Sequence, residues 1–343
     1  MTAQADVGYQ ARQHGRWQWS EGAFWVLTLA CVFLFPSRYL IMTEIVRLAL
    51  FALSLDLILG YAGIVSLGHA AFFGVGAYSA GLLALHGIIS EPLIALVVAG
   101  LAAMVVGFLT SFLVIRGADL TRLMVTLGIA LLLEALAERF SNITGGTDGL
   151  QGIEMQPILG LFAFDMFGRT GLFYSLTVLF LLFLLARRVV HSPFGLSLRA
   201  IKNNPLRAAA IGIPVNRRLI AIYTLSAFYA GIAGALLTQT TALASLDVFA
   251  FERSADLMLM LVIGGAGYLY GGLIGAVVFK MLQELFSTIT PQYWQFWIGL
   301  VLVVMVLVGR TRIHRWALFV PNLVIRHVAG RKAVVALTDN EAP

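Results

Sequence analysis

Eight ionisable side chains lie within or beside long apolar stretches of this sequence, where charged groups are rare and usually have a function. They are Glu44, Arg47, Asp56, His69, Glu134, Asp256, Lys280 and Glu284. Most of them fall near the ends of an apolar stretch, where a long side chain can reach the headgroup region. Asp56 does not, because it comes one turn before Gly60, where the helical pattern is interrupted. Asp56 is therefore a candidate for lining a polar path, with a bond to a neighbouring helix as the alternative.

Catalytic and metal-binding motifs are missing from the sequence. Ser66 lies in GIVSLG, which has one residue too many before the serine for a nucleophile elbow. There is no HExxH pair, and the glycine runs lack the GK[ST] ending of a phosphate-binding loop. His69 has no second ligand at metal-site spacing, and Cys31 is the single cysteine. We expect no enzyme, no metal and no cofactor in this chain, so energy from ATP would have to come from another chain.

Two glycine-rich stretches interrupt the apolar pattern, GYAGIVSLGHAAFFGVGAYSAG at residues 60–81 and GGAGYLYGG at residues 264–272. Broken helices are a usual sign of a substrate path, because freed backbone groups can face a polar solute. Small residues four apart also permit close packing of helices, and both roles can hold together. The predicted path residues are Asp56, Gly60, Gly63, Ser66, Gly68, His69, Gly264, Gly265 and Gly267.

A basic polar interval covers residues 187–218 between two very apolar stretches. It contains seven Lys and Arg residues and no Asp or Glu, which is typical of a cytoplasmic loop. A short helix is predicted inside it, with Asn204 as N-cap, Pro205 at the first helical position and Gly212 after the C-terminal end. This surface helix could dock another protein. The alternative is a connecting loop whose charges only set the topology.

The composition predicts a polytopic membrane protein. Hydrophobic residues make up 60% of the 343 residues and charged ones 12%, and the mean hydropathy is +0.90. The net charge of +6 does not indicate nucleic acid, because the basic residues cluster in the interval 187–218 and between Arg310 and Lys332, as in membrane-flanking segments. Apolar stretches long enough to span lie at residues 23–42, 45–60, 69–85, 93–115, 120–137, 171–186, 219–243 and 294–309.

The number of spans on each side of the basic interval gives the expected topology. With the interval 187–218 in the cytoplasm, counting the spans backwards places the N-terminus inside as well. Counting forwards, the basic C-terminal tail falls inside only if residues 255–286 enter and leave the membrane by one face. The sequence thus predicts an all-α fold of eight to ten transmembrane segments, with a glycine-broken hairpin near the C-terminus. One long helix with a Gly267, Gly271 and Gly275 packing stripe is the alternative. We expect a cytoplasmic tail at residues 1–20, a transmembrane domain at 21–310 and a basic cytoplasmic tail at 311–343.

The longest external connection, residues 141–168, contains TGGTDGLQG. Such a turn-rich loop suits contact with something that arrives from outside. Its candidate contact residues are Gly145, Gly146, Thr147, Asp148 and Gly149.

Four motifs together carry a resemblance. They are the residue 60–81 stretch, GGTDGLQGI, LRAIKNNPLRAAAIGIPVNRRLIAIYTLSAFYAGIAGAL and GGAGYLYGGLIGA, in that order between about Phe51 and Gly309. In these the chain resembles the permease subunits of branched-chain amino acid ABC importers, and the LivM subunit more than its partner LivH. The resemblance implies the LivH/LivM type of permease fold in the bacterial inner membrane. It also implies four partner subunits besides the lipid bilayer: a homologous LivH-like permease, two ATPase subunits that bind ATP-Mg, and a periplasmic amino-acid-binding protein that would contact the external loop.

The resemblance assigns the short helix of the basic interval to ATPase coupling. The residues that correspond are Arg199, Asn203, Asn204, Pro205, Leu206, Arg207, Ala208, Ala209, Ala210, Ile211 and Gly212. Family members usually carry acidic residues around the positions of Asn203, Pro205 and Ala209, whereas here Arg207 is the helix's only charge. Coupling would then depend on apolar insertion and an arginine contact.

Other functions stay open at this level. A urea or short-chain amide ABC permease would have similar glycine motifs, although GGTDGLQGI favours amino acids. An ion-coupled secondary transporter would also use broken helices but would need no ATPase partner. A membrane enzyme would need converging histidines or carboxylates, which the scattered ionisable residues do not provide.

Overall fold

The computed structural model describes residues 19–117, 119–165 and 167–308, and the chain divides into two compact units, Met1–Lys280 and Met281–Pro343. All regular elements in the described part are helices, with two isolated bridges and no named strand. The predicted all-α class is therefore confirmed. The predicted tails lie almost wholly outside the described residues, which include only residues 19–20 of the first and none of the second.

The described helices follow one another along the chain in short steps. They are α2 (Trp19–Leu34), α3 (Tyr39–Ala62), α4 (Ala70–Leu85), α5 (Pro92–Arg116), α6 (Asp119–Arg139), α7 (Ser141–Thr144), α8 (Arg169–Val190), α9 (Pro193–Asn203), α10 (Pro205–Ala210), α11 (Val215–Thr241), α12 (Phe251–Gly264), α13 (Leu269–Ile289) and α14 (Trp294–Val308). Short 3-10 turns are η1 (Pro36–Arg38), η2 (Gly146–Asp148) and η3 (Leu246–Phe249).

Six of these helices are long and apolar enough to cross a membrane: α3, α5, α6, α8, α11 and α13, while α2 and α4 are shorter apolar helices. The total of eight to ten segments stays a prediction. The predicted spans agree with the helices to within a few residues, except the first. The stretch 23–42 is interrupted because Pro36 forces the preceding residue out of the helical region, so α2 ends at Leu34.

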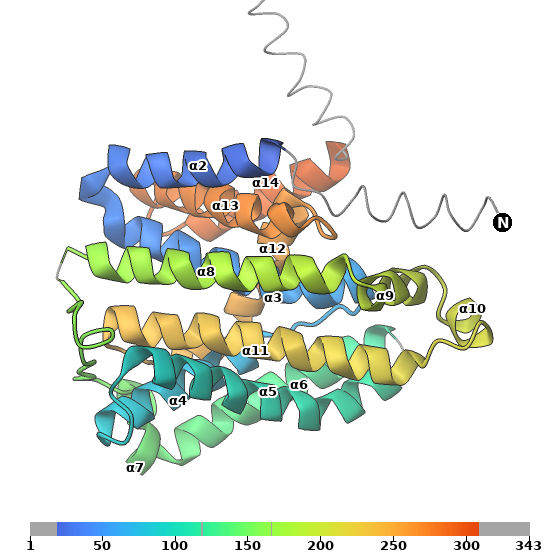
Figure 1. Cartoon of the computed structure of the whole chain (residues 1–343), viewed down its shortest axis with the longest axis horizontal. Helices are drawn as coiled ribbons and strands as arrows, with labels where there is room; N and C mark the ends of the chain where they lie inside the picture. The colour runs from blue at the N-terminus through green and yellow to red at the C-terminus, as the bar shows by residue number, and fades with distance from the viewer. Residues whose placement is uncertain (1–18, 118, 166, 309–343) are drawn as a thin grey trace, which may run out of the picture. The chain divides into compact units, whose positions relative to one another are not determined.

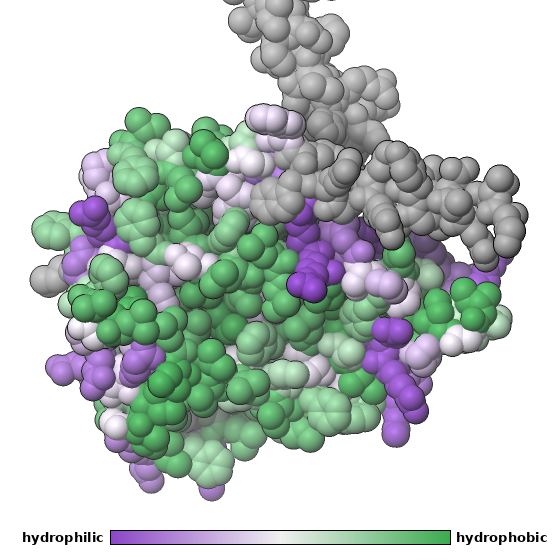
Figure 2. Space-filling view, in the orientation of Figure 1, coloured by the Kyte–Doolittle hydropathy of each residue, from purple (hydrophilic) through white to green (hydrophobic). Residues whose placement is uncertain are grey.

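Helices α3 and α11 form the interior of the first unit. In their most apolar windows 83% and 78% of the residues are buried, against 17% in α6, so α6 lies at the surface of this unit. Helix α11 packs against α3, α4 and α5, and α3 also packs against α8. Figure 1 shows α8, α11 and α5 side by side, and Figure 2 shows hydrophobic residues over much of the same face, as expected for a surface in contact with lipid.

The first unit has two chemically different ends. At one end Glu21 of α2 pairs with Arg187 of α8 at 2.9 Å, and α9 and α10 follow (Figure 1). We call this the basic end. At the other end the connection 145–165 folds back, and Leu150 forms a two-hydrogen-bond bridge with Ala244 after α11. We call this the loop end.

Residues 255–286 form the predicted hairpin rather than one long helix. Helices α12 and α13 run antiparallel, so closely that a Cβ added to Gly264 would overlap the Gly271 carbonyl and one added to Gly275 the Met260 carbonyl. The turn between them has Gly265 at φ +99° and Gly267 at φ +89°, a region that glycine adopts without strain. The small residues of α13, Gly271 and Gly275, therefore do pack closely, but they pack against α12 within the hairpin. Helix α13, at 21 residues, is long enough for a full crossing of the membrane, whereas α12 has 14 residues.

Close backbone approach also holds α4 against α11. A Cβ added to Gly76 would overlap the Gly231 carbonyl, and one added to Gly234 would overlap the Phe73 carbonyl. Glycine at these positions allows the two helices to approach closely and make many dispersion contacts. These contacts hold helices together in lipid, where the hydrophobic effect between helices is weak.

Gly234→Ala should therefore destabilise the protein. The added methyl group overlaps backbone that cannot swing aside, and overpacking of this kind costs about 1–3 kcal/mol. Thermal unfolding of the purified protein in detergent measures the effect. Gly128→Ala is the matched control, because a Cβ at Gly128 of α6 meets nothing within 4 Å and Ala favours a helix by up to about 1 kcal/mol over Gly. Equal unfolding temperatures for the two variants would contradict the close packing.

Candidate functional site

Asp56 lies in the interior of the bundle near the end of α3, fully buried. Its Oδ1 accepts a hydrogen bond of 2.7 Å from the backbone N–H of Gly267 in the α12–α13 turn. Gly60 lies one helical turn later, and a Cβ there would overlap both Asp56 Oδ1 and the Gly267 nitrogen. The two glycine breaks that the sequence predicted separately, residues 60–68 and 264–267, therefore meet at Asp56.

Two cationic side chains of α9, Lys202 and Arg199, contact the end of α3 where the two breaks meet. Lys202 Nζ donates a hydrogen bond of 2.7 Å to the Gly60 carbonyl oxygen. The Arg199 guanidinium carbon lies 5.3 Å from the centre of the Tyr61 ring, a cation–π contact. Both contacts hold α9 to the last turn of α3.

His69 belongs to a second buried polar cluster between α3, α4 and α11. Its Nε2 lies 2.9 Å from Ser54 Oγ and 3.3 Å from Ser226 Oγ, and Ser226 Oγ donates a short hydrogen bond to the Ser54 carbonyl. The ring stacks on Phe51. This is the environment of an interhelical histidine rather than of a metal ligand, and no group of three or more His, Cys, Asp or Glu able to hold a metal occurs among residues 19–117, 119–165 and 167–308.

Two of the remaining predicted path residues, Gly63 and Gly68, allow helix ends and backbone segments to approach closely around these clusters. Gly63 ends α3 at φ +75° and packs against Lys202. A Cβ at Gly68 would overlap the Thr126 carbonyl of α6. Ser66 is fully buried, and its hydroxyl has no partner among the described residues. The structure thus brings Asp56, Gly60, Gly63 and the turn at residues 264–267 together near the end of α3, and places His69 in a separate cluster. Whether these residues line a path stays a prediction.

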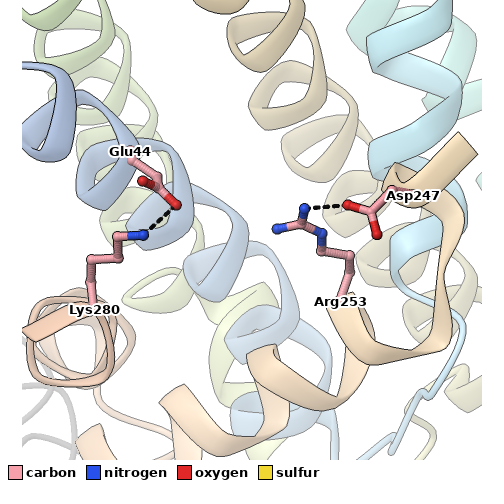
Figure 3. A network of polar contacts seen from close by, with 4 residues as sticks. All are labelled: Glu44, Asp247, Arg253 and Lys280. Atoms are coloured by element: carbon pink, nitrogen blue, oxygen red, sulfur yellow. Dashed lines mark hydrogen bonds and ion pairs between the residues drawn. The ribbon is translucent and has the colours of Figure 1, made fainter. Parts of the chain in front are cut away.

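A set of charged side chains lies toward the loop end, and Figure 3 shows two of its pairs. Glu44 of α3 accepts a hydrogen bond of 2.7 Å from Lys280 of α13, and Arg253 of α12 pairs with Asp247 of η3. Glu44 and Arg47 lie three residues apart in the sequence, a spacing that allows an ion pair on one helix face. The structure instead pairs Glu44 with Lys280, and Arg47 donates a hydrogen bond of 3.2 Å to Thr240 Oγ1 near the C-terminal end of α11.

The predicted helix of the basic interval is present as α10. Asn204 Oδ1 accepts from the Arg207 N–H at 3.0 Å, Pro205 begins the helix, and Gly212 follows at φ +87°. Leu206 and Ile211 are 82% and 74% exposed, and hydrophobic residues gather at α10 in Figure 2. In water, large apolar groups this exposed indicate a contact surface.

Helix α9 is an element that the sequence reading missed. It begins with Pro193 at its first position and buries Gly195, Leu198 and Ile201. The spacing of Leu198 and Ile201 was a usable signal. Lys202 was missed as a site residue because its partner, the Gly60 carbonyl, lies 142 positions away in the sequence.

The candidate external loop is ordered against the loop end. Gly145, Gly146 and Gly149 have φ values of +75°, +57° and +69°, and Gly149 packs against the Ala244 carbonyl. Thr147 and Asp148 are exposed at its tip. Contact with a partner at this tip stays a prediction.

These features define a polytopic, all-helical membrane protein with a buried polar break and a short, exposed, capped helix, the class to which membrane permeases belong. The family described as "Branched-chain amino acid transport system / permease component" matches residues 38–307. The chain therefore belongs to this family of transport permeases, as the resemblance predicted.

Several curated proteins are similar to the chain. The high-affinity branched-chain amino acid transport system permease protein LivM of Escherichia coli is 27% identical over 277 residues, which cover 74% of this chain and 64% of LivM. A probable branched-chain amino acid transport permease protein LivH of Methanocaldococcus jannaschii is 29% identical over 70% of this chain and 77% of its own. The ribose import permease protein RbsC of Bacillus subtilis is 31% identical over 46% of this chain and 53% of its own. No solved structure matches the chain significantly.

Asn204→Ala should loosen α10. Loss of an N-cap side chain costs about 1 kcal/mol of helix stability, or about a fivefold faster opening. Hydrogen exchange followed by mass spectrometry on the peptide covering residues 204–212 measures it. Asn203→Ala is the control, because this neighbouring Asn is exposed and its side chain bonds to none of the described residues. Equal acceleration in both variants would contradict the cap.

Proposed function

We propose that the chain is the LivM-like membrane subunit of an ATP-driven importer for branched-chain or related amino acids. Its residues provide half of a translocation path and a docking helix, and they carry out no reaction. The observation that carries the proposal is α10, a capped helix with two protruding apolar side chains in a member of a transport permease family.

Helix α10 is suited to insertion into a groove of an ATPase subunit. Every residue of α10 except Ala208 is exposed. Because Arg207 is its one charged residue, binding would depend on the burial of Leu206 and Ile211 and on an arginine contact, and not on acidic side chains. Mg-ATP would bind to two such partner subunits.

The other partners follow from the two ends of the bundle. A homologous LivH-like permease would complete the path, and a periplasmic binding protein would deliver the amino acid to the tip of the external loop at Thr147 and Asp148. The basic end would then lie in the bacterial cytoplasm together with both termini, as the excess of Lys and Arg in residues 187–218 favours.

Leu206→Ser combined with Ile211→Ser should reduce association with the ATPase subunits strongly. Each large apolar side chain buried in a groove contributes about 1.5–3 kcal/mol, so the double variant should lose at least about a hundredfold in affinity. Co-purification of the ATPase subunits with the tagged permease pair, and uptake of radioactive leucine, measure the loss. A Gly/Ser linker in place of residues 206–211 should abolish both.

Leu161→Ser is the matched control, since Leu161 is 78% exposed in the connection at the loop end. It should leave ATPase association unchanged. Full association and uptake in the Leu206→Ser, Ile211→Ser variant would overturn the docking role of α10, and uptake without any ATPase subunit would favour a secondary transporter.

A further inference from the structure

We propose that Lys202 and Asp56 are positioning residues that couple the docking helix to the α12–α13 turn. In this proposal Lys202, the Gly60 carbonyl, Asp56 and Gly267 act as one linkage, which we call the Lys202–Asp56 linkage. It rests on the proposed function, because it assigns a means of transmission to the same docking site.

The first part of the linkage joins α10 to α9. Asn204 is the only residue between these helices, and its N–H donates to the Ala200 carbonyl of α9 at 3.1 Å while its side chain caps α10. Helix α9 is held in turn by the buried side chains of Leu198 and Ile201. A displacement of α10 by a bound partner is therefore passed to α9, since no flexible segment separates them.

The second part joins α9 to the end of α3. Lys202 Nζ donates to the Gly60 oxygen at 2.7 Å, and its side-chain carbons pack against Gly63. Residue 60 lies in the last helical turn, where the carbonyl groups lack intrahelical partners and carry the negative end of the helix dipole. A lysine here supplies both a donor and a complementary charge.

The third part joins α3 to the turn between α12 and α13. Asp56 Oδ1 accepts the Gly267 N–H at 2.7 Å, and this bond crosses 211 positions of sequence. The carboxylate is fully buried, and its Oδ2 has no partner among the described residues. Removing Lys202 would leave the Gly60 carbonyl, one helical turn after Asp56, without its side-chain donor, and loss of this bond at the end of the broken helix should disturb the turn.

The turn is the part of the linkage that would follow a movement of α3. Gly265 and Gly267 have φ values of +99° and +89°, and Tyr268 beside them is 71% exposed. Because the α12–α13 hairpin approaches α3 at Gly60 without any side chain between, a shift of the end of α3 must be followed by the turn or must break the Asp56 bond. The linkage therefore transmits motion from the basic end into the region of the predicted path.

Coupling between transport and ATP hydrolysis tests the linkage. The whole complex, with the partner permease, both ATPase subunits and the binding protein, is reconstituted in lipid vesicles. Leucine uptake and ATP hydrolysis are measured together per assembled complex for Asp56→Leu, which keeps a similar shape but removes the oxygen that accepts the Gly267 N–H, and for Lys202→Met. We expect uptake per ATP to fall about tenfold, the size of a typical coupling free energy, while hydrolysis stays within about twofold of the unchanged protein.

Three further variants sharpen the result. Asp56→Leu combined with Lys202→Met should be no worse than either single change, because linked residues are not additive. Lys202→Arg should restore much of the coupling, since it keeps a cationic donor. Arg188→Met removes another exposed cation of the basic interval and should leave uptake per ATP unchanged.

Two outcomes would overturn the linkage. One is an equal fall of uptake and hydrolysis, or failure of both single variants to assemble, which would mean that the residues only stabilise the fold. The other is an unchanged uptake per ATP. If instead the unmodified complex shows no ATP-dependent uptake, the proposed function itself fails, so the two failures are distinguishable.

Discussion

Broken helices inside a lipid-embedded bundle must satisfy their backbone groups from within the protein, because no water is available there. This constraint governs the region where the two glycine breaks meet. Asp56 accepts the Gly267 N–H, Lys202 donates to the Gly60 carbonyl, and Ser254 of α12 accepts the Ala70 N–H at the start of α4. Each of these side chains comes from a different helix than the group it satisfies. The polar contacts that repair the breaks are thus also the contacts that tie the helices together.

Different parts of the bundle are held by different interactions, close backbone packing in one part and side-chain hydrogen bonds to the backbone in another. Helices α4 and α11 approach so closely at Gly234 that they form a rigid contact. The α12–α13 turn, by contrast, is a connection of glycines with positive φ, and the N–H of one of them, Gly267, bonds to Asp56 of α3. A transporter needs both properties, a fixed body and a part that can shift. In this chain the part that would shift lies next to the end of α3 that α9 holds.

Much of this arrangement could be predicted from the sequence. Hydropathy and charge parity gave the helical class and the hairpin, and local capping rules gave α10, since Asn204 and Pro205 act on their immediate neighbours. The meeting of Asp56 with Gly267 could not be predicted, because it joins residues 211 positions apart. The same holds for Glu44, where local spacing suggested Arg47 but tertiary packing supplied Lys280. Long-range pairing depends on which helix faces which, and periodicity does not encode that.

The pair of Glu44 and Lys280 also bears on how the chain is made. Helix α12 has 14 residues, about 21 Å, too short to cross a hydrocarbon layer of about 30 Å, and the charge of Lys280 within α13 opposes the transfer of that helix into lipid. Glu44 belongs to α3, which is synthesised long before α13. The carboxylate that pairs with Lys280 is therefore already part of the chain when the hairpin is made. Insertion of the hairpin beside α3 would then cost less free energy than insertion into lipid alone.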